Sequence, residues 1–188
     1  NSLYIYLQLN YIPAPETIFA NVKKLMPGHY MVVSRQKMDI QRYYQIPYNR
    51  EQAETNKLPY PQAKEKLKTL LEASVQRRLV SDVPLGAFLS GGIDSSVVTA
   101  LARKHKPDLH TFSIGFQDEK FFDETHYARL VAKKLNTTHT VFSLTNNDLY
   151  AHVHSILDYI DEPFADSSAI AVYILSKETR KHATVALS

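Results

Sequence analysis

The strongest constraint on the fold is the regular alternation of two sequence patterns after residue 62. Short apolar runs predict strands at residues 84–89, 110–116, 138–144 and 183–187. Between them, apolar residues recur at helical spacing, which predicts helices at residues 95–104, 123–135, 147–159 and 168–181. Buried strands separated by helices are typical of a parallel sheet with helices on both faces. The predicted fold class is therefore α/β.

The first part of the chain is built differently. Six of the nine prolines lie within residues 1–61, alternating runs at 29–33 and 38–44 predict two strands, and Tyr4 and Tyr6 stand in strand-like surroundings. Residues 45–62 are polar, proline-spaced and without an apolar period, which is typical of a linker. Apolar residues at helical spacing follow, from Leu67 to Leu79. The predicted organisation is a segment at 1–46, a linker at 47–62 and the α/β unit at 63–188.

Composition excludes several classes of function. The 22 basic and 19 acidic residues give a net charge of +3 without a basic block, so nucleic-acid binding is not required by the charge. The absence of cysteine excludes disulfides, thiolate metal sites and thiol nucleophiles within these residues. No apolar run reaches the roughly 18 residues that a membrane span needs. We expect a globular, cytoplasmic protein.

Residues 88–96, Phe-Leu-Ser-Gly-Gly-Ile-Asp-Ser-Ser, carry the chemistry. They supply the end of a strand, a tight turn and the start of a helix. Gly91 and Gly92 allow the backbone to turn and to approach a ligand closely, and the N–H groups at the helix start form an anion-binding concavity. The spacing therefore predicts a phosphate-binding loop.

The side chains of this loop make the prediction more specific. Hydroxyls at 90, 95 and 96 can bond phosphate oxygens, whereas the Asp94 carboxylate would repel an anion unless Mg2+ lay between them. No lysine occurs between Lys68 and Lys104, so the loop is not a Walker loop and kinase-like transfer is disfavoured. The alternative is an ordinary Gly-Gly turn in which Asp94 and Ser95 only cap the helix.

The loop resembles that of the ATP pyrophosphatases, or PP-loop enzymes, and three further stretches narrow the resemblance. Residues 111–116 (Thr-Phe-Ser-Ile-Gly-Phe), 161–170 (Asp-Glu-Pro-Phe-Ala-Asp-Ser-Ser-Ala-Ile) and 184–188 (Thr-Val-Ala-Leu-Ser) together resemble glutamine-hydrolysing asparagine synthetases of the bacterial B type. Residues 11–15 and 25–30 look like the closing segment of that family's N-terminal glutaminase domain. The resemblance implies an adenine nucleotide α-hydrolase-like fold, preceded by a β-rich remnant of an Ntn-type domain.

The resemblance also implies a reaction. The family activates the carboxylate of an acceptor, here expected to be aspartate, as an acyl-adenylate and releases pyrophosphate. Ammonia derived from glutamine then forms the amide, with ATP and Mg2+ required, and the full-length protein is expected to form a homodimer. Three alternatives stay open: a PP-loop amidotransferase with another acceptor, a tRNA-modifying enzyme, and a nucleotide-binding module without catalysis.

Site residues follow from the resemblance, position by position. Leu89 and Ile114 would contact adenosine through backbone and apolar surface. The residues expected to hold ATP, its pyrophosphate and the metal are Ser90, Gly91, Gly92, Asp94, Ser95, Ser96 and Ser188, with Asp94 as the metal ligand. Ser167 and Ser168 match two threonines near the family's aspartate substrate. Ile170 stands where well-known members carry an arginine, so a cationic clamp for the acceptor is not expected.

Two parts of the family's machinery are not found in the sequence. The strand at 185–188 continues in the family into Gly-(Asp/Glu)-Gly-x-Asp-Glu, which supplies a catalytic carboxylate and a second metal ligand, and the glutamine-cleaving nucleophile is an N-terminal cysteine. We expect a fragment without a complete catalytic set, inactive alone.

Other polar residues have less specific patterns. The pairs His152 and His154, and His126 and His139, lack an acidic partner at metal-ligand spacing, which favours surface or packing roles. A final group of carboxylates either faces the ATP site or caps solvated loops, and comprises Asp158, Asp161, Glu162 and Asp166.

Overall fold

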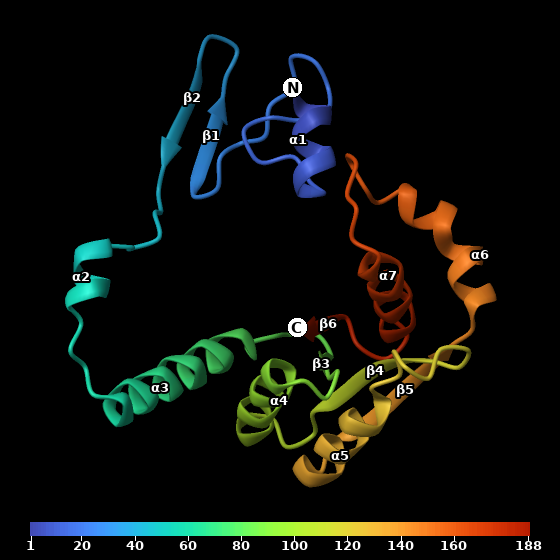
Figure 1. Cartoon of the computed structure of the whole chain (residues 1–188). Coiled ribbons are helices and arrows are strands. Elements are labelled where there is room, and N and C mark those ends of the chain that lie inside the picture. The colour runs from blue at the N-terminus through green and yellow to red at the C-terminus, as the bar shows by residue number, and fades with distance from the viewer. The chain divides into compact units, whose positions relative to one another are not determined.

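The computed structural model describes residues 1–188 and divides into two compact units. The first unit consists of Asn1–Lys57 and Leu157–Asp166, and the second of Leu58–Ile156 and Ser167–Ser188. Figure 1 shows the helices and strands of both. The second unit contains the larger sheet and the candidate site.

A four-stranded parallel sheet organises the second unit, with the strand order β5-β4-β3-β6. Its strands are β3 (Leu85–Phe88), β4 (His110–Phe116), β5 (Thr138–Leu144) and β6 (Val185–Leu187). All four coincide with the predicted apolar runs, which confirms the predicted α/β class. This order places β3 and β4 at the centre of the sheet. They are the most buried strands because both of their edges are paired.

Five helices accompany this sheet: α3 (Tyr60–Arg78), α4 (Ile93–His105), α5 (Thr125–Leu135), α6 (Asn146–Leu157) and α7 (Ser168–Thr179). On one face, Leu89 packs against Ala128 and Ala132 of α5. On the other, Phe112 packs against Leu175 of α7. Successive strand residues point to opposite faces, so β4 serves both layers at once, with Thr111 and Ser113 toward one and Phe112 toward the other.

The rest of the core lies where α3 and α4 meet the sheet. Val75 of α3, Leu101 of α4 and Leu85 of β3 belong to one buried cluster with Ala87 and Leu109. Gly86 is required here, since a Cβ would lie 2.6 Å from the Phe112 ring and 2.9 Å from the His110 carbonyl oxygen. Close packing around Phe112 therefore fixes the spacing of β3 and β4.

The first unit contains α1 (Ser2–Leu9), the antiparallel pair β1 (His29–Val33) and β2 (Met38–Arg42), and α2 (Arg50–Thr55). The strand-like interpretation of Tyr4 and Tyr6 is wrong, because both lie in α1. Helical bonds hold this segment, with Asn10 N 2.8 Å from Tyr6 O. A short run that is apolar at most positions has no period that distinguishes a strand from a helix.

Two smaller differences concern residues 43–55. Strand β2 ends at Arg42 because the N–H groups of Tyr43 and Tyr44 both turn to the Gly28 carbonyl, at 2.8 and 3.1 Å. Helix α2 lies inside the stretch for which the sequence predicted no element, and the Asn49 side chain caps it by accepting from Gln52 N at 3.0 Å. None of the helices combines the length and the apolar character that a membrane-spanning helix requires.

Two partly buried histidines make the stability of this sheet depend on pH. His110 stacks on Phe112 at 4.3 Å, and its pKa is lowered by burial and then by His182. The pKa of His139 is lowered by burial, against a hydrogen bond with the Thr111 backbone that raises it, with smaller lowering contributions from Arg129 and His110. Both folded-state values lie below the ordinary histidine value of about 6.5.

We predict that the free energy of unfolding falls as the pH is lowered through about 6.5. The unfolded chain binds protons at His110 and His139 more readily than the folded chain does, so this stabilisation is complete above that pH and is lost below it. Chemical denaturation followed by circular dichroism at a series of pH values measures the slope. Replacing both histidines by glutamine should flatten it, and an unchanged slope in the double variant would contradict the assignment.

Candidate functional site

The loop between β3 and α4 is shaped by its two glycines. Gly91 has a φ of +87°, in the left-handed region, and a Cβ there would lie 2.6 Å from both Ala128 N and Tyr127 Cβ. Gly92 is the N-cap of α4 with ordinary extended angles, and a Cβ there would meet only the Ser90 hydroxyl, at 3.3 Å. Gly91 is thus required by conformation and by space, whereas Gly92 is not.

Hydroxyl groups tie this loop to the first turn of α4. Ser95 Oγ lies 2.9 Å from Ser90 Oγ and accepts from Ser90 N at 3.3 Å. Gly92 N donates to Ser90 Oγ at 3.2 Å. The predicted phosphate-binding hydroxyls of Ser90 and Ser95 are therefore brought together, and in the free protein they bond to each other.

The amino end of α4 is left open. No side chain caps it, and the N–H groups of Ile93, Asp94 and Ser95 have no partner within the protein. The Ser96 hydroxyl is buried and also lacks a partner. Unpaired donors at the positive end of a helix bind anions, so the residues present fit a phosphate group.

Asp94 lies in the first turn of α4, exposed and without a bond to any protein group. The structure contains no cluster of three or more metal-ligating side chains. A hard divalent cation at Asp94 would take its remaining oxygen ligands from phosphate and water, as Mg2+ commonly does. The donor set thus fits a phosphate-bound Mg2+ better than a metal held by protein alone.

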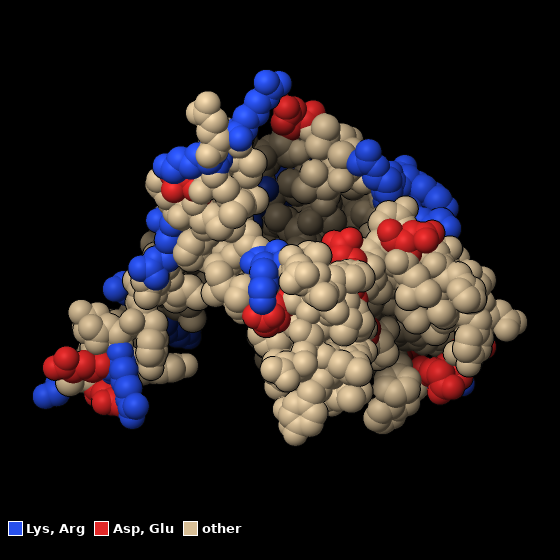
Figure 2. All heavy atoms as spheres, turned by 90° about the horizontal axis from the view of Figure 1, so that it is seen from above, with Lys and Arg blue, Asp and Glu red and all other residues tan.

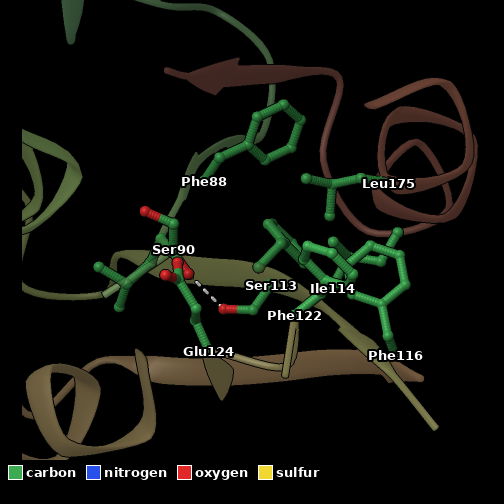
Figure 3. A pocket seen from close by; sticks show the side chains of 10 residues that line it. Phe88, Ser90, Ser113, Ile114, Phe116, Phe122, Glu124 and Leu175 are labelled. Atoms are coloured by element: carbon green, nitrogen blue, oxygen red, sulfur yellow. Dashed lines mark hydrogen bonds between the residues drawn. The ribbon is translucent and has the colours of Figure 1, made fainter. Parts of the chain in front are cut away.

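A pocket of about 170 Å3 lies beside this loop, at the carboxyl ends of β3 and β4 (Figure 3). Leu89, Ser90 and Ile114, all predicted site residues, line it. The other lining residues are Phe88, Phe112, Ser113, Phe116, Phe122, Glu124 and Leu175. Aromatic and aliphatic walls beside an anion-binding loop suit a purine base next to its phosphates.

Leu89 differs in one respect from the expectation that its backbone contacts adenosine. Its N–H donates to Phe112 O at 2.9 Å, and its carbonyl accepts a short hydrogen bond from the Ser113 hydroxyl. The side chain is only 1% exposed. A ligand can therefore reach only the second lone pair of the carbonyl oxygen and a small apolar surface, which leaves Ile114 as the more accessible wall.

Glu124 is a pocket residue that the sequence did not single out. It precedes α5, and its side chain points toward Ser90 in Figure 3. An acidic residue just before a helix is common wherever it favours the helix dipole, so the sequence carries no signal that separates this role from a ligand contact. Only the packing of α5 against the loop brings the carboxylate to the pocket.

The two predicted acceptor residues lie elsewhere. Ser167 and Ser168, at the start of α7, line a second pocket of about 620 Å3 between α6, α7 and the end of β4. This pocket shares Ile114, Phe116, Phe122 and Leu175 with the first, so the two are neighbours. Ile170 lines it, no lysine or arginine does, and Glu119 is its one charged side chain.

Ser188 follows β6 at the same edge of the sheet. Leu187 pairs with Ala87 of β3, so Ser188 lies beyond the carboxyl end of β6, beside the strand that leads into the loop. The parallel arrangement thus gathers the predicted ATP-site residues from three strand ends.

Several of the remaining polar residues have structural partners. The His152 ring lies 2.8 Å from Asp148 O and 3.0 Å from Lys177 Nζ, and the His126 and Tyr127 rings are in tilted contact, with their centroids 3.7 Å apart. Glu162 forms an ion pair with Lys24 within the first unit. On the face shown in Figure 2, basic side chains occur in small groups, several beside acidic ones.

Comparisons with known proteins add an independent finding. The family model described as asparagine synthase matches residues 66–188, and the model of a glutamine amidotransferase domain matches residues 1–44. Asparagine synthetase (glutamine-hydrolysing) 1 of Bacillus subtilis is 34% identical over 100% of this chain and 29% of its own length. A putative asparagine synthetase 2 of Methanocaldococcus jannaschii is 35% identical over 100% of this chain and 36% of its own length. The chain thus spans about a third of these curated relatives.

Among solved structures the similarity is weak. An NMN synthetase from Francisella tularensis has a TM-score of 0.43 and 19% identity, covering 65% of this chain and 50% of that chain.

We predict that Gly91→Ala lowers the free energy of unfolding by about 2 kcal/mol or more, because an L-residue is strained at that φ and its Cβ clashes with α5. Gly92→Ala is the matched control, and it should cost less than about 1 kcal/mol. Denaturant titration of both variants measures the difference. Equal losses would mean that the close approach of Gly91 to α5 does not constrain the loop.

Proposed function

The chain belongs to the asparagine synthase family, and we propose that it forms the ATP-binding part of an amide-forming ligase. In the proposed reaction an acceptor carboxylate oxygen attacks the α-phosphorus of ATP, and the bond to the bridging oxygen breaks to release pyrophosphate. Ammonia then attacks the acyl carbon, and AMP leaves. The observation that carries the proposal is the open amino end of α4 beside a purine-sized apolar pocket.

The loop residues would act mainly on the leaving group. Gly91 allows the backbone to turn, and the N–H groups of Ile93, Asp94 and Ser95 can donate to pyrophosphate oxygens as negative charge accumulates on them. Donors that are already in place when the charge develops stabilise the transition state without reorganisation. The buried Ser96 hydroxyl supplies one further donor.

The nucleoside would bind in the neighbouring pocket. Ile114 and the surrounding rings would cover the base, and Glu124 is placed to accept hydrogen bonds from ribose hydroxyls. Asp94 would hold Mg2+, whose positive charge neutralises pyrophosphate when it is bound. Ser188, at the end of β6, borders the same edge.

Aspartate is the acceptor suggested by the relatives' names, and Ser167 and Ser168 are the candidate contacts. Aspartate carries two carboxylates, and burying an unpaired carboxylate is costly. The absence of lysine and arginine from the lining of the second pocket therefore favours a second candidate, a carboxylic acid with a more apolar body. Glutamine would supply ammonia through the domain whose model matches residues 1–44, and a homodimer of the longer protein remains part of the proposal.

We predict that this chain binds ATP more tightly with Mg2+ than without it. Asp94→Asn should lower the affinity for ATP about tenfold when Mg2+ is present and should not lower it when Mg2+ is absent. The reason is that the carboxylate contributes through the metal, while it repels the free nucleotide. Calorimetric titration with ATP, performed once in MgCl2 and once in EDTA, measures the affinity with and without the metal. Asp82→Asn, at the opposite end of β3, is the matched control and should behave as the original chain. Equal Mg2+-dependent affinities in the Asp94 and Asp82 variants would remove Asp94 from the site.

The acceptor is tested by isotope exchange between pyrophosphate and ATP, which requires an acyl-adenylate. We expect exchange to depend on an added carboxylic acid, and a panel from aspartate to its apolar analogues would rank the acceptors. The panel is best applied to a longer protein that includes this chain, since the chain spans only about a third of its relatives. ATP binding without exchange for any acid would favour the binding-module alternative.

A further inference from the structure

A line of polar side chains crosses the α5 face of the sheet and ends at the nucleotide loop. Thr111 and Ser113 of β4 are buried, and His139 of β5 lies partly buried beside them. His139 Nδ1 is 2.9 Å from Thr111 Oγ1, and His139 Nε2 is 3.3 Å from Ser113 Oγ. Ser113 Oγ in turn makes its short hydrogen bond to the Leu89 carbonyl oxygen (Figure 3).

The short bond to the Leu89 carbonyl oxygen fixes the direction at Ser113, and the other directions follow from it. A carbonyl oxygen cannot donate, so the single Ser113 hydroxyl proton points at Leu89. Toward His139 the Ser113 oxygen can then only accept, which requires a proton on Nε2. In the neutral ring Nδ1 is then an acceptor, so the Thr111 hydroxyl donates to Nδ1 at 2.9 Å and not to its alternative acceptor, the Thr138 carbonyl oxygen, at 3.4 Å. Thr111 Oγ1 can accept in turn from Thr137 Oγ1, 3.0 Å away.

We infer that His139 is a positioning residue for the nucleotide loop, acting through Ser113 on the Leu89 carbonyl group. The inference rests on the proposed function in one respect, that this loop binds ATP. Without a donor at Nε2, the Ser113 hydroxyl would be free to rotate away from Leu89. With the Nε2–H donor in place, the Ser113 hydroxyl has one orientation in which it donates to the Leu89 carbonyl oxygen and accepts from His139.

The Leu89 carbonyl matters because of the peptide unit to which it belongs. The planar unit that carries Leu89 C=O also carries Ser90 N–H, so fixing one group fixes the other. Ser90 N donates to Ser95 Oγ at 3.3 Å, in the first turn of α4. The peptide is therefore held from the sheet on one side and from α4 on the other, at the point where the chain enters the loop.

His110 provides an internal comparison. It lies on the same strand as Ser113 and is partly buried, but on the opposite face, where its Nε2 is 2.9 Å from Thr140 Oγ1. It has no bonded path to Leu89. Replacing it should disturb the packing of the sheet to a similar degree without altering the loop.

The first test needs no ligand. Two-bond nitrogen–proton correlation on the labelled chain at neutral pH should show the Nε2–H tautomer for His139. In His139→Leu the carbonyl carbon shift of Leu89 should move, and in His110→Leu it should not. The Nδ1–H tautomer, or an unmoved Leu89 carbonyl in His139→Leu, overturns the inference whatever the chain binds.

The second test measures function. His139→Leu should raise the dissociation constant for ATP–Mg2+ about tenfold. In His139→Gln, whose amide can donate to Ser113, the dissociation constant should stay within about twofold of the original value. The dissociation constant of His110→Leu should equal that of the original chain. Ser113→Ala should reproduce the loss and serves if His139→Leu does not fold. Equal affinities in the two leucine variants contradict the positioning role. If the original chain binds no ATP, the proposed function fails, and the tautomer and the Leu89 shift still decide whether His139 fixes the loop.

Discussion

The parallel pairing of β3 with β4 is the contact on which the second unit depends. It aligns Phe88 with Phe112, so the chain leaves both strands at one edge of the sheet. Phe112 fills the space beside Gly86 and leaves no room for a Cβ there. Just beyond this pair, the Leu89 N–H donates to the Phe112 carbonyl oxygen at 2.9 Å. The pocket walls, the loop and the hydroxyl of Ser113 all take their places from this register.

The same edge of the sheet concentrates features that a purely structural turn does not need. Gly91 is held in a left-handed conformation against α5, the first N–H groups of α4 are unpaired, and the Ser96 hydroxyl is buried without a partner. The buried Ser96 hydroxyl costs stability because it has no hydrogen-bond partner, whereas the N–H groups of α4 are left to water. Under the proposed function, phosphate oxygens of the nucleotide would complete these hydrogen bonds and offset that cost.

Much of this arrangement could be predicted from the chain itself. Apolar runs located all four parallel strands, and glycine and serine spacing located the loop, because both signals are local and repeat at fixed intervals. The prediction failed for Tyr4 and Tyr6, where an apolar run without a period forms α1. It also missed α2, a short helix that the Asn49 side chain caps. Glu124 was missed for a different reason, since its proximity to Ser90 arises from the packing of α5 and not from any pattern around it.

The sequence by itself determined the fold class, the family and the position of the loop between β3 and α4, because these rest on periodicity and on residues adjacent in the chain. Only the tertiary structure decided which groups of that loop are available to a ligand. It showed that Ser90 and Ser95 bond to each other, that both backbone groups of Leu89 are engaged, and that the N–H groups of α4 are open. It also linked His139 to Leu89 through Ser113, across fifty residues of sequence separation. Hydrogen-bond partners from different strands depend on register and on which face each side chain occupies, and both are fixed only when the sheet and its helices pack together.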